Sequence, residues 1–233
     1  MQIKQLPALS DNYIYLIECQ NGSICIDPGD VKPVLEAVEG GLIAIMNTHH
    51  HDDHIAGNAE LKRHFECPLI APDDERIADC DLIAQEGSPL TVDEATFTVF
   101  FVPGHTKTHI AFYLPTQKAV FTGDSLFCGG CGRLFEGTPA DMLTSLKKLA
   151  ALPPDTNVYC GHEYTQINLA FAHQLEPDNE KVKKRLNSHP MVPSTIAEEL
   201  ETNPFLRAKE VLQMDDELAA FTQLRQLKDN FSQ

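Results

Sequence analysis

The sequence has no long apolar run and few basic residues, and each absence excludes a class of protein. Its longest apolar stretches, such as GLIAIM and FTVFFV, are far shorter than the ~20 residues that a membrane-spanning helix needs. The stretch MQIKQLPALSDNY lacks the apolar core and small-residue cleavage site of a signal peptide. Lys and Arg number 18 against 34 Asp and Glu, for a formal net charge of -16. Because affinity for nucleic acid comes mainly from Lys and Arg on phosphates, we expect a soluble chain that binds neither membrane nor nucleic acid.

The cysteines also lack a pattern. Seven are scattered along 233 residues, an odd number without the spacing of a disulfide framework, which predicts a reducing, cytoplasmic environment. Cys128 and Cys131 form a single C-x-x-C, with no second pair for a zinc ribbon and no strand-to-helix junction of the thioredoxin kind. We therefore interpret the two glycines between them as a tight loop, in preference to a redox or zinc site.

Up to about residue 165, short stretches rich in β-branched and aromatic residues predict strands that end in polar residues. These strands cover residues 23–29, 41–49, 95–105, 109–115, 119–124 and 157–162. Helical spacing separates them at residues 30–40, 54–65 and 138–153, the last with Thr138 as N-cap, Pro139 at N1 and Asp141 at N3.

After residue 165 no strand is predicted. Residues 165–177, 179–189 and 195–204 have helical patterns separated by breaks that contain proline. A last helix is predicted over residues 215–231, which begin with acidic residues and carry basic residues near their end, as the helix dipole favours. We therefore place a domain boundary near residue 165.

The stretch NTHHHDDH, residues 47–54, concentrates four histidines and two aspartates directly after an apolar strand. In an extended chain alternate side chains share a face, which places His49, His51 and Asp53 together, with His54 at the turn into the next helix. The alternative is a helix with His50 and His54 paired at i and i+4. Since that frame lacks the Glu general base of the H-E-x-x-H proteases, we favour the alternating frame.

Three more candidate ligands, His105, Asp124 and His162, each stand just beyond a predicted strand and follow a glycine. Glycine lets the backbone turn sharply and come close to whatever the side chain binds. Strand ends on a rigid sheet are where α/β proteins place functional groups. A single loop histidine is more often structural or merely exposed, but seven such residues at strand ends predict one shared site.

Together the candidates comprise five imidazoles and two carboxylates, more than one tetrahedral zinc ion can use. Divided between two metals with one carboxylate as a bridge, they form a dinuclear site that holds a hydroxide ready for attack and polarises the scissile group. Zinc, iron and manganese all accept these ligands. We expect two divalent metal ions, Zn2+ foremost with Fe or Mn as alternatives, and a hydrolytic reaction.

The run Thr-His-x-His-x-Asp-His, with the later Gly-His, Gly-Asp and Gly-His strand ends, resembles the signature of the metallo-β-lactamase superfamily. The resemblance implies an α+β fold, a four-layer αββα sandwich with the site at one edge of its two sheets. It also implies that Asp27 lies behind the ligands and steadies them, whereas its alternative is a turn-forming role. The implied ligands are His49, His51 and His105 for one metal, Asp53, His54 and His162 for the other, and Asp124 as the bridge.

Over nearly its whole length the chain resembles the hydroxyacylglutathione hydrolase (glyoxalase II) family of that superfamily. The stretches LSDNYIYLI, NTHHHDDHIAGN, GCGRLFEGTPADM and GHEYTQINLAFA carry the likeness, and the C-terminal helices match the family's small appended domain. The resemblance implies a catalytic domain over residues 1–165 and a helical glutathione-binding domain over residues 166–233. It implies hydrolysis of S-D-lactoylglutathione, an S-(2-hydroxyacyl)glutathione, to D-lactate and glutathione, the second step of methylglyoxal detoxification.

The implied chemistry depends on two carboxylates besides the metals. A hydroxide attacks the thioester carbonyl while the metals stabilise the developing oxyanion, and the departing thiolate needs little protonation. Asp53 would orient the hydroxide in addition to its ligand role, and Asp124 would bridge the metals. We therefore count both aspartates as catalytic.

Glutathione carries two carboxylates and one ammonium group, so its pocket should contain cations. Family positions place Arg133, Arg225 and Lys228 there, with Phe135 and Tyr164 as further contacts. Arg225 and Lys228, three residues apart, lie on one helix face and could clamp a carboxylate together. Without the resemblance they would be interpreted as an ordinary solvated helix end.

Two positions depart from the family pattern. Many members have tyrosine where this chain has Phe135, so one hydroxyl contact is missing, which weakens binding by about 1 kcal/mol. Thr108 and His109 stand where many members have Gly-His, and we interpret His109 as structural or supporting instead of ligating.

Other functions remain as alternatives. One is a different dinuclear metallohydrolase of the superfamily, and another is a glutathione persulfide dioxygenase, which uses one iron with fewer ligands and is disfavoured by the presence of His54 and His162. A non-catalytic metal sensor would leave Arg133, Tyr164 and the C-terminal cations without a shared purpose. We expect a monomer whose partner is a small glutathione thioester.

Overall fold

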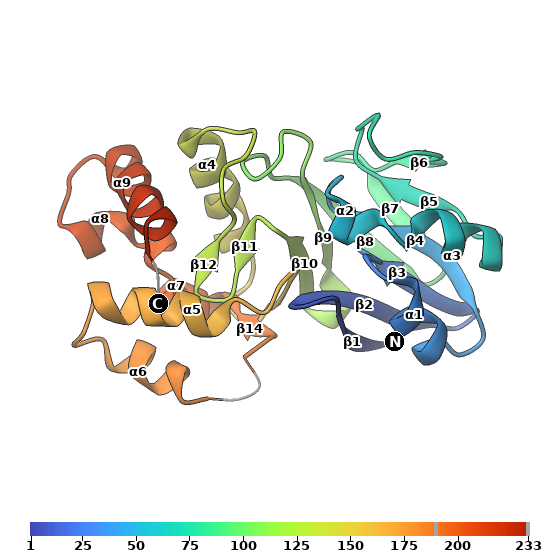
Figure 1. Ribbon diagram of the computed structural model, residues 1–233, viewed down its shortest axis with the longest axis horizontal. Helices are drawn as coiled ribbons and strands as arrows, with labels where there is room; N and C mark the ends of the chain where they lie inside the picture. Colours follow the sequence, from blue (N-terminus) through green and yellow to red (C-terminus); the bar gives the residue numbers. More distant parts are fainter. Residues whose placement is uncertain (189–190, 232–233) are drawn as a thin grey trace. The chain divides into compact units, whose positions relative to one another are not determined.

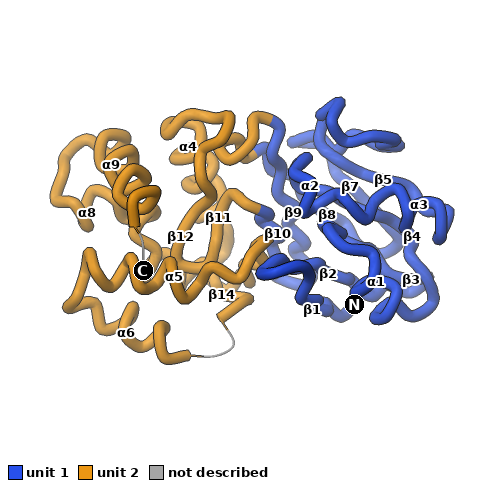
Figure 2. The backbone as a smooth tube through the Cα atoms, in the orientation of Figure 1, with its two compact units in different colours: residues 1–101, 108–123 blue, residues 102–107, 124–233 orange. Residues whose placement is uncertain are grey.

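The computed structural model describes residues 1–188 and 191–231. The chain forms two compact units, shown in different colours in Figure 2: unit 1 comprises residues 1–101 and 108–123, and unit 2 comprises residues 102–107 and 124–233. This division follows packing alone, so the predicted functional boundary near residue 165 stays a prediction.

Unit 1 contains a sheet whose six strands lie side by side in their order along the chain. The pairing is antiparallel from β1 to β3 and parallel from β3 to β6. Parallel neighbours need crossover connections, and helices supply the first two of them (Figure 1). The strands are β1 Gln2–Ala8, β2 Asn12–Cys19, β3 Gly22–Ile26, β4 Leu42–Met46, β5 Leu69–Ala71 and β6 Leu82–Ile83.

A second group of strands in unit 1 is an antiparallel meander, and it packs against the first sheet. Its strands are β7 Pro89–Val92, β8 Ala95–Phe101, β9 Ile110–Leu114 and β10 Ala119–Gly123, with the 3-10 turn η1 Pro115–Gln117 before the last. Phe97 and Val99 of β8 are buried and alternate with exposed threonines, as a sheet with one covered face requires. The rings of Tyr15 on β2 and Phe121 on β10 lie 5.3 Å apart, so the two sheets meet face to face.

Short helices cover the other side of the first sheet. They are α1 Val31–Ala37, α2 Asp52–Ile55 and α3 Asn58–Phe65. Val34 of α1 and Leu61 of α3 are fully buried and join Ile45 and Leu69 in one apolar cluster. Unit 1 is therefore a helix–sheet–sheet sandwich, in agreement with the predicted fold class.

Unit 2 is mainly helical. It contains two antiparallel strand pairs, β11 Leu126–Phe127 with β12 Gly130–Cys131 and β13 Asn157–Cys160 with β14 Ser194–Thr195. The helices are α4 Pro139–Ala150, α5 Thr165–Leu175, α6 Glu180–Leu186, α7 Ile196–Thr202, α8 Ala208–Leu212 and α9 Glu217–Asp229, with the 3-10 turn η2 Pro204–Leu206. None of the helices in the described ranges is long and apolar enough to cross a membrane.

Most predicted elements are present within a few residues of their expected ends. Thr138 and Asp141 form the predicted capping box at the start of α4, and Cys128-Gly129 is the tight turn expected in the C-x-x-C. Three predictions are corrected or incomplete. Strands do not stop at residue 165, since β14 pairs with β13. The described part of the helix predicted over residues 179–189 ends at Leu186, and His189 lies outside the described residues.

The third correction concerns the single helix predicted over residues 54–65, which is divided into α2 and α3 at Gly57. The Gly57 amide donates to the Pro28 carbonyl at 2.8 Å. A Cβ atom on residue 57 would lie 2.5 Å from that oxygen, so only glycine lets the chain approach the turn after β3. This long-range contact overrides the helical spacing.

Phe121 offers a test of the contact between the sheets. Its ring is buried against Tyr15, so Phe121→Ala should lower the free energy of unfolding by about 3–5 kcal/mol through lost burial and a cavity. Phe101→Ala, on β8 with a ring 41% exposed, is the matched control and should cost much less. Chemical denaturation of both variants measures the difference; equal losses would contradict this account of the sandwich.

Candidate metal centre

The histidine-rich stretch begins directly after the buried strand β4. Asn47, Thr48 and His49 have no exposed surface, so the first candidate ligand projects from the sandwich interior. The Asn47 side-chain amide donates to the His54 backbone carbonyl at 3.1 Å, and the Asn58 side-chain amide donates to Asn47 Oδ1 at 2.7 Å. These bonds close the loop from β4 back onto the start of α3.

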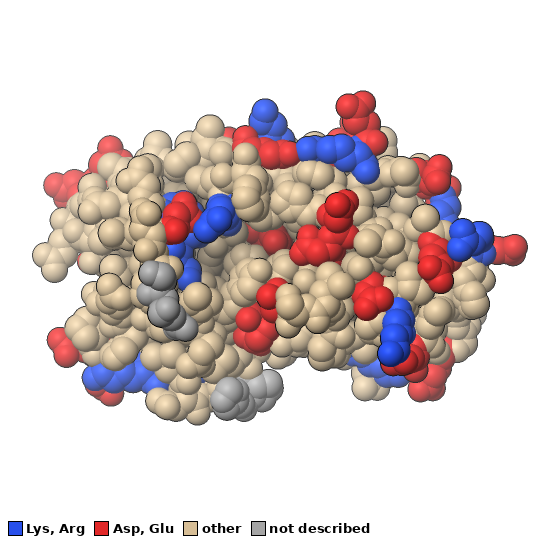
Figure 3. Space-filling view, viewed as in Figure 1, with Lys and Arg blue, Asp and Glu red and all other residues tan. Residues whose placement is uncertain are grey.

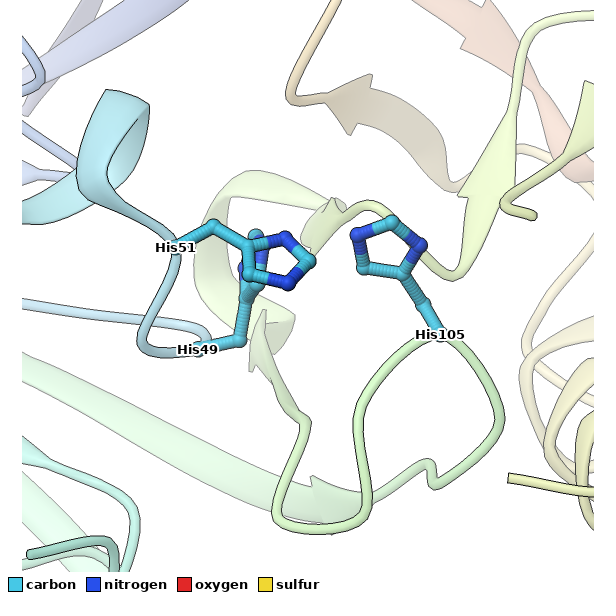
Figure 4. Close-up of side chains that lie close together, drawn as sticks. All are labelled: His49, His51 and His105. Carbon is cyan, nitrogen blue, oxygen red and sulfur yellow. The ribbon is translucent and has the colours of Figure 1, made fainter. Parts of the chain in front are cut away.

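His49 and His51 face one another on this loop. His49 Nε2 lies 3.1 Å from His51 Nδ1, and the ring centroids are 4.7 Å apart (Figure 4). His105, drawn in the same figure, comes from the loop between β8 and β9, which belongs to unit 2. Two imidazole nitrogens this close fit a shared cation, because each can direct a lone pair toward it.

The predicted extended frame holds only as far as His51. His51 has an extended backbone and caps α2, which contains both Asp53 and His54. The expected alternation through Asp53 is therefore wrong, and the alternative His50–His54 helical pair does not form either, because His50 precedes the helix. Acidic residues at the first positions of α2 lie at its positive end, which favours the turn.

α2 is held so that Asp53 and His54 project together. His54 Nε2 lies 3.6 Å from Asp53 Oδ2, and the Asn12 amide of β2 donates to the same Asp53 oxygen at 2.8 Å. Gly29 lies against this helix: a Cβ atom there would sit 1.8 Å from the Asp53 carbonyl oxygen. Asn12 was missed from the sequence alone, because nothing in its surroundings marks it as a partner of a residue 41 positions away.

Asp27 lies directly behind the candidate ligand His54. Its backbone has φ of +51° at the end of β3, and its carboxylate is almost fully buried. It accepts hydrogen bonds from the Thr48 amide at 2.8 Å and hydroxyl at 2.7 Å, and lies 3.2 Å from His54 Nδ1. A proton on His54 Nδ1 donates to Asp27, which leaves the lone pair on Nε2, the nitrogen that faces Asp53. Asp27, His49 and His54 offer ligand atoms within 4.8 Å of one another.

His109 supports the site as an aromatic neighbour. It is fully buried and stacks on His49 at 4.6 Å with an interplanar angle of 17°. Gly123, at the end of β10, has φ of +48°, and a Cβ there would lie 2.3 Å from the Thr48 hydroxyl and 2.8 Å from the His109 ring. This close approach of β10 fixes His109 against the ligand loop.

His50 is directed to a separate polar cluster. Its Nδ1 lies 3.4 Å from Asp74 Oδ2, and Arg76 donates to both oxygens of Asp74 at 2.8 and 2.7 Å. The hydrogen-bonded Arg76 guanidinium holds the pKa of the Asp74 carboxyl well below its usual range. Thr108, one of the departures from the family pattern, donates its hydroxyl to the same carboxylate. His50 and Thr108 therefore anchor two loops of unit 1 on Asp74.

Unit 2 brings the other three candidate ligands together. His105 Nε2 and His162 Nε2 each lie 3.3 Å from Asp124 Oδ2. His105 Nδ1 lies 2.8 Å from the Arg133 carbonyl, which fixes the proton on Nδ1 and leaves Nε2 directed at Asp124. A Cβ on Gly132 would lie 1.9 Å from the Asp124 carbonyl oxygen, so this approach requires glycine.

Aromatic side chains flank these ligands. Tyr164 stacks on His162 with ring centroids 4.8 Å apart, and the ring of Phe127 lies 5.9 Å from His162. Phe135 meets the ring of His105 edge-on at 5.2 Å and is 61% exposed. The two predicted substrate contacts Tyr164 and Phe135 therefore each lie against a candidate metal ligand.

The predicted cations gather around the end of α9, where basic side chains lie beside an acidic one (Figure 3). Arg225 is buried; it donates through Nε and NH2 to Asp229 Oδ1 at 3.2 and 2.9 Å, and through NH1 to the Cys131 carbonyl at 2.9 Å. Arg133, more than half exposed, lies 3.5 Å from the same Asp229 oxygen. Arg225 thus uses its donors within the protein, whereas Arg133 offers an accessible guanidinium.

Lys228 is the third cation. Its ammonium lies 5.6 Å from the ring of Phe171 and 5.2 Å from that of Phe231. Burial, and then the nearby charge of Arg225, lowers the pKa of Lys228 to about 8. An amine with this pKa changes its charge within the physiological range.

The donor set fits divalent cations. Buried imidazole nitrogens and carboxylate oxygens converge within each unit, and the far nitrogens of His54 and His105 are held by Asp27 and by a carbonyl. Such backing orients a histidine ligand and raises its basicity. No cysteine is among these donors, so zinc, iron and manganese are all chemically compatible.

Comparison with known proteins gives the same result for both parts of the chain. Residues 10–162 match the model of the metallo-beta-lactamase superfamily, and residues 163–231 match the hydroxyacylglutathione hydrolase C-terminus. A hydroxyacylglutathione hydrolase of Cyanothece sp. is 44% identical, over 99% of this chain and 100% of that protein.

Solved structures share the fold. ETHE1 from Myxococcus xanthus superposes with a TM-score of 0.74 at 25% identity, over 100% of this chain and 93% of that chain. TTHA1623, solved in a di-iron-bound form, gives a TM-score of 0.64 at 29% identity, over 88% of this chain and 100% of that chain. With both family models matched and full-length relatives above 40% identity, the chain belongs to the hydroxyacylglutathione hydrolase family of the metallo-β-lactamase superfamily.

Proposed function

We propose that the chain hydrolyses S-(2-hydroxyacyl)glutathione thioesters, S-D-lactoylglutathione in particular, to the hydroxy acid and glutathione. The observation that carries this proposal is the pairing of a His/Asp ligand set with the cations Arg133, Arg225 and Lys228 around Asp229. Residues 1–165 would form the catalytic domain and residues 166–233 the glutathione-binding domain, in a cytoplasmic monomer. The second step of methylglyoxal detoxification is the corresponding role in the cell.

The seven ligands would hold two divalent cations, with zinc as the expected metal. Contacts inside each unit support this assignment: His49 with His51, Asp53 with His54, and Asp124 with both His105 and His162. Iron stays open, since TTHA1623 of the same fold was solved in a di-iron form. One cation would be bound by His49, His51 and His105, the other by Asp53, His54 and His162, with Asp124 shared.

Bound divalent cations would lower the pKa of a water molecule and polarise the thioester carbonyl. The protein contributes orientation. Asp53, fixed by the Asn12 amide, would accept a hydrogen bond from the attacking water and align it. Asp124 would help to hold both cations, and its carboxylate oxygen Oδ2 lies 3.3 Å from the Nε2 atoms of His105 and His162. The thiolate leaves with little protonation, so no strong general acid is required.

The glutathione moiety would lie along the cations and aromatic rings of unit 2. Lys228 and Arg133 would contact its carboxylates, Tyr164 would donate its hydroxyl, and Phe135 would pack against the peptide backbone. Arg225 would add its charge while it holds Cys131 and Asp229 in place. The exposed ring of Phe135 lacks the tyrosine hydroxyl common in the family.

The direct test uses purified protein loaded with two metals. When it is incubated with S-D-lactoylglutathione, the thioester absorbance should fall, and one mole of thiol should appear for each mole of thioester lost. Glutathione persulfide with oxygen uptake as the readout tests the dioxygenase alternative in parallel. If protein with two metals bound does not hydrolyse the thioester, the proposal is wrong.

Asp27→Asn tests the carboxylate behind His54. Loss of its charge weakens the hydrogen bond that fixes the His54 ring, so metal affinity should fall about 10–100-fold. Competition with a chromophoric chelator measures this change without any assay of turnover. Asp52→Asn, an exposed aspartate two positions before His54, is the control and should bind metal like the wild type.

Lys228 predicts a pH dependence of substrate binding. Its pKa of about 8 means that the amine is mostly cationic below this pH and mostly neutral above it, so KM for the glutathione thioester should rise as pH increases through about 8. Lys228→Ala should have a high KM at every pH with a smaller change in kcat. Lys228→Arg keeps its charge and should abolish the rise. The same rise in the Arg variant would show that another group titrates.

A further inference from the structure

The turn of the β11–β12 hairpin is held by side chains of the C-terminal helical region. The Gly129 amide donates to Glu199 Oε2 at 2.8 Å, and Asn203 Nδ2 donates to the Gly130 carbonyl at 2.9 Å. Asn168 Nδ2 donates to the Cys128 carbonyl at 3.2 Å. Three buried side chains thus satisfy three backbone groups of one short turn.

These side chains belong to a buried polar network. Glu199, fully buried on α7, accepts from Arg185 NH2 at 2.5 Å through Oε1 and from Asn203 at 2.9 Å through Oε2. Arg185 NH1 also donates to the Thr202 hydroxyl at 2.6 Å. Buried charges are tolerated when they are paired and hydrogen-bonded, and such networks hold their members in one arrangement.

The turn has no room to shift toward these helices. Gly129 has φ of +74°, and a Cβ there would lie 3.0 Å from Leu169. A Cβ on Gly130 would lie 2.6 Å from Asn168 Nδ2. The side chains of α5 therefore contact the backbone of the turn directly.

The other end of the hairpin leads into the candidate metal centre. Asp124 stands two residues before β11 and Arg133 two residues after β12, and the Gly132 amide donates to the Ser125 carbonyl at 3.1 Å between them. The Arg133 carbonyl accepts from His105 Nδ1. The ring of Phe127, on the hairpin itself, contacts His162. All three ligands of unit 2 are thus connected to this hairpin.

We propose that Glu199, Asn203 and Asn168 are positioning residues that set the geometry of Asp124, His105 and His162 through the β11–β12 hairpin. The proposal rests on the proposed metal site. If the turn moves, the Arg133 carbonyl and Asp124 move with it, and the two imidazole Nε2 atoms lose their common position beside the Asp124 carboxylate. The C-terminal region would then serve the metal ligands as well as the glutathione thioester.

The test compares Asn203→Ala and Asn168→Ala with Thr202→Val. Asn203 and Asn168 donate hydrogen bonds to the hairpin, whereas the hydroxyl of Thr202, buried on the same helix as Glu199, accepts from Arg185 and donates to the Glu198 carbonyl. Chelator competition should show about tenfold weaker binding of metal in both asparagine variants and unchanged binding in the threonine variant. Thermal unfolding of the metal-free proteins reports any general loss of stability, and kcat should fall more than KM changes.

Two results would overturn the proposal: wild-type metal affinity in both asparagine variants, or an equal loss of affinity in Thr202→Val. If Asn203→Ala does not fold, Asn168→Ala decides, because Asn168 lies outside the Glu199–Arg185 pair. Failure of the proposed function can be distinguished from failure of this inference, because the wild-type protein itself would then bind no metal pair or leave the thioester intact.

Discussion

Two buried imidazoles of the candidate centre, His54 and His105, each have a hydrogen-bond acceptor that fixes the position of the ring proton. A ring whose proton could move between its nitrogens would present a lone pair only part of the time. Asp27 holds the proton of His54 on Nδ1, and the Arg133 carbonyl does the same for His105. The two acceptors come from different places in the fold: Asp27 follows a strand of unit 1, and the Arg133 carbonyl lies in a loop after a hairpin of unit 2.

The fold supplies these acceptors at strand ends. Asp27 follows β3, and its two bonds to Thr48 connect that strand end to the end of β4. Because β3 and β4 are parallel neighbours, their carboxyl ends meet at one edge of the sheet. The pairing of β3 with β4 therefore places the loop that begins at residue 47 next to the carboxylate of Asp27.

Much of this arrangement could be predicted from sequence. The ligand types, their glycine neighbours and the positions of the strands that precede them are local signals, as are the cap of α4 and the C-terminal helices. The roles of Asn12, Asp74 and Glu199 could not be predicted, because each contacts a residue far away in the sequence. Asn12 contacts Asp53, 41 positions away; Asp74 contacts His50, 24 positions away; and Glu199 contacts Gly129, 70 positions away. The break between α2 and α3 was missed for the same reason, since it depends on the Pro28 carbonyl and not on local helical spacing.

The glycines that border the candidate ligands limit how this protein can evolve. At positions 29, 123 and 132 a single added carbon would collide with Asp53, Thr48 or Asp124, so the backbone behind the ligands is closed to variation. Phe135, beside His105, has most of its ring exposed and no such restriction. Divergence toward other acyl groups would therefore accumulate on the open side of the centre, around residue 135, while the backbone turns behind it stay unchanged.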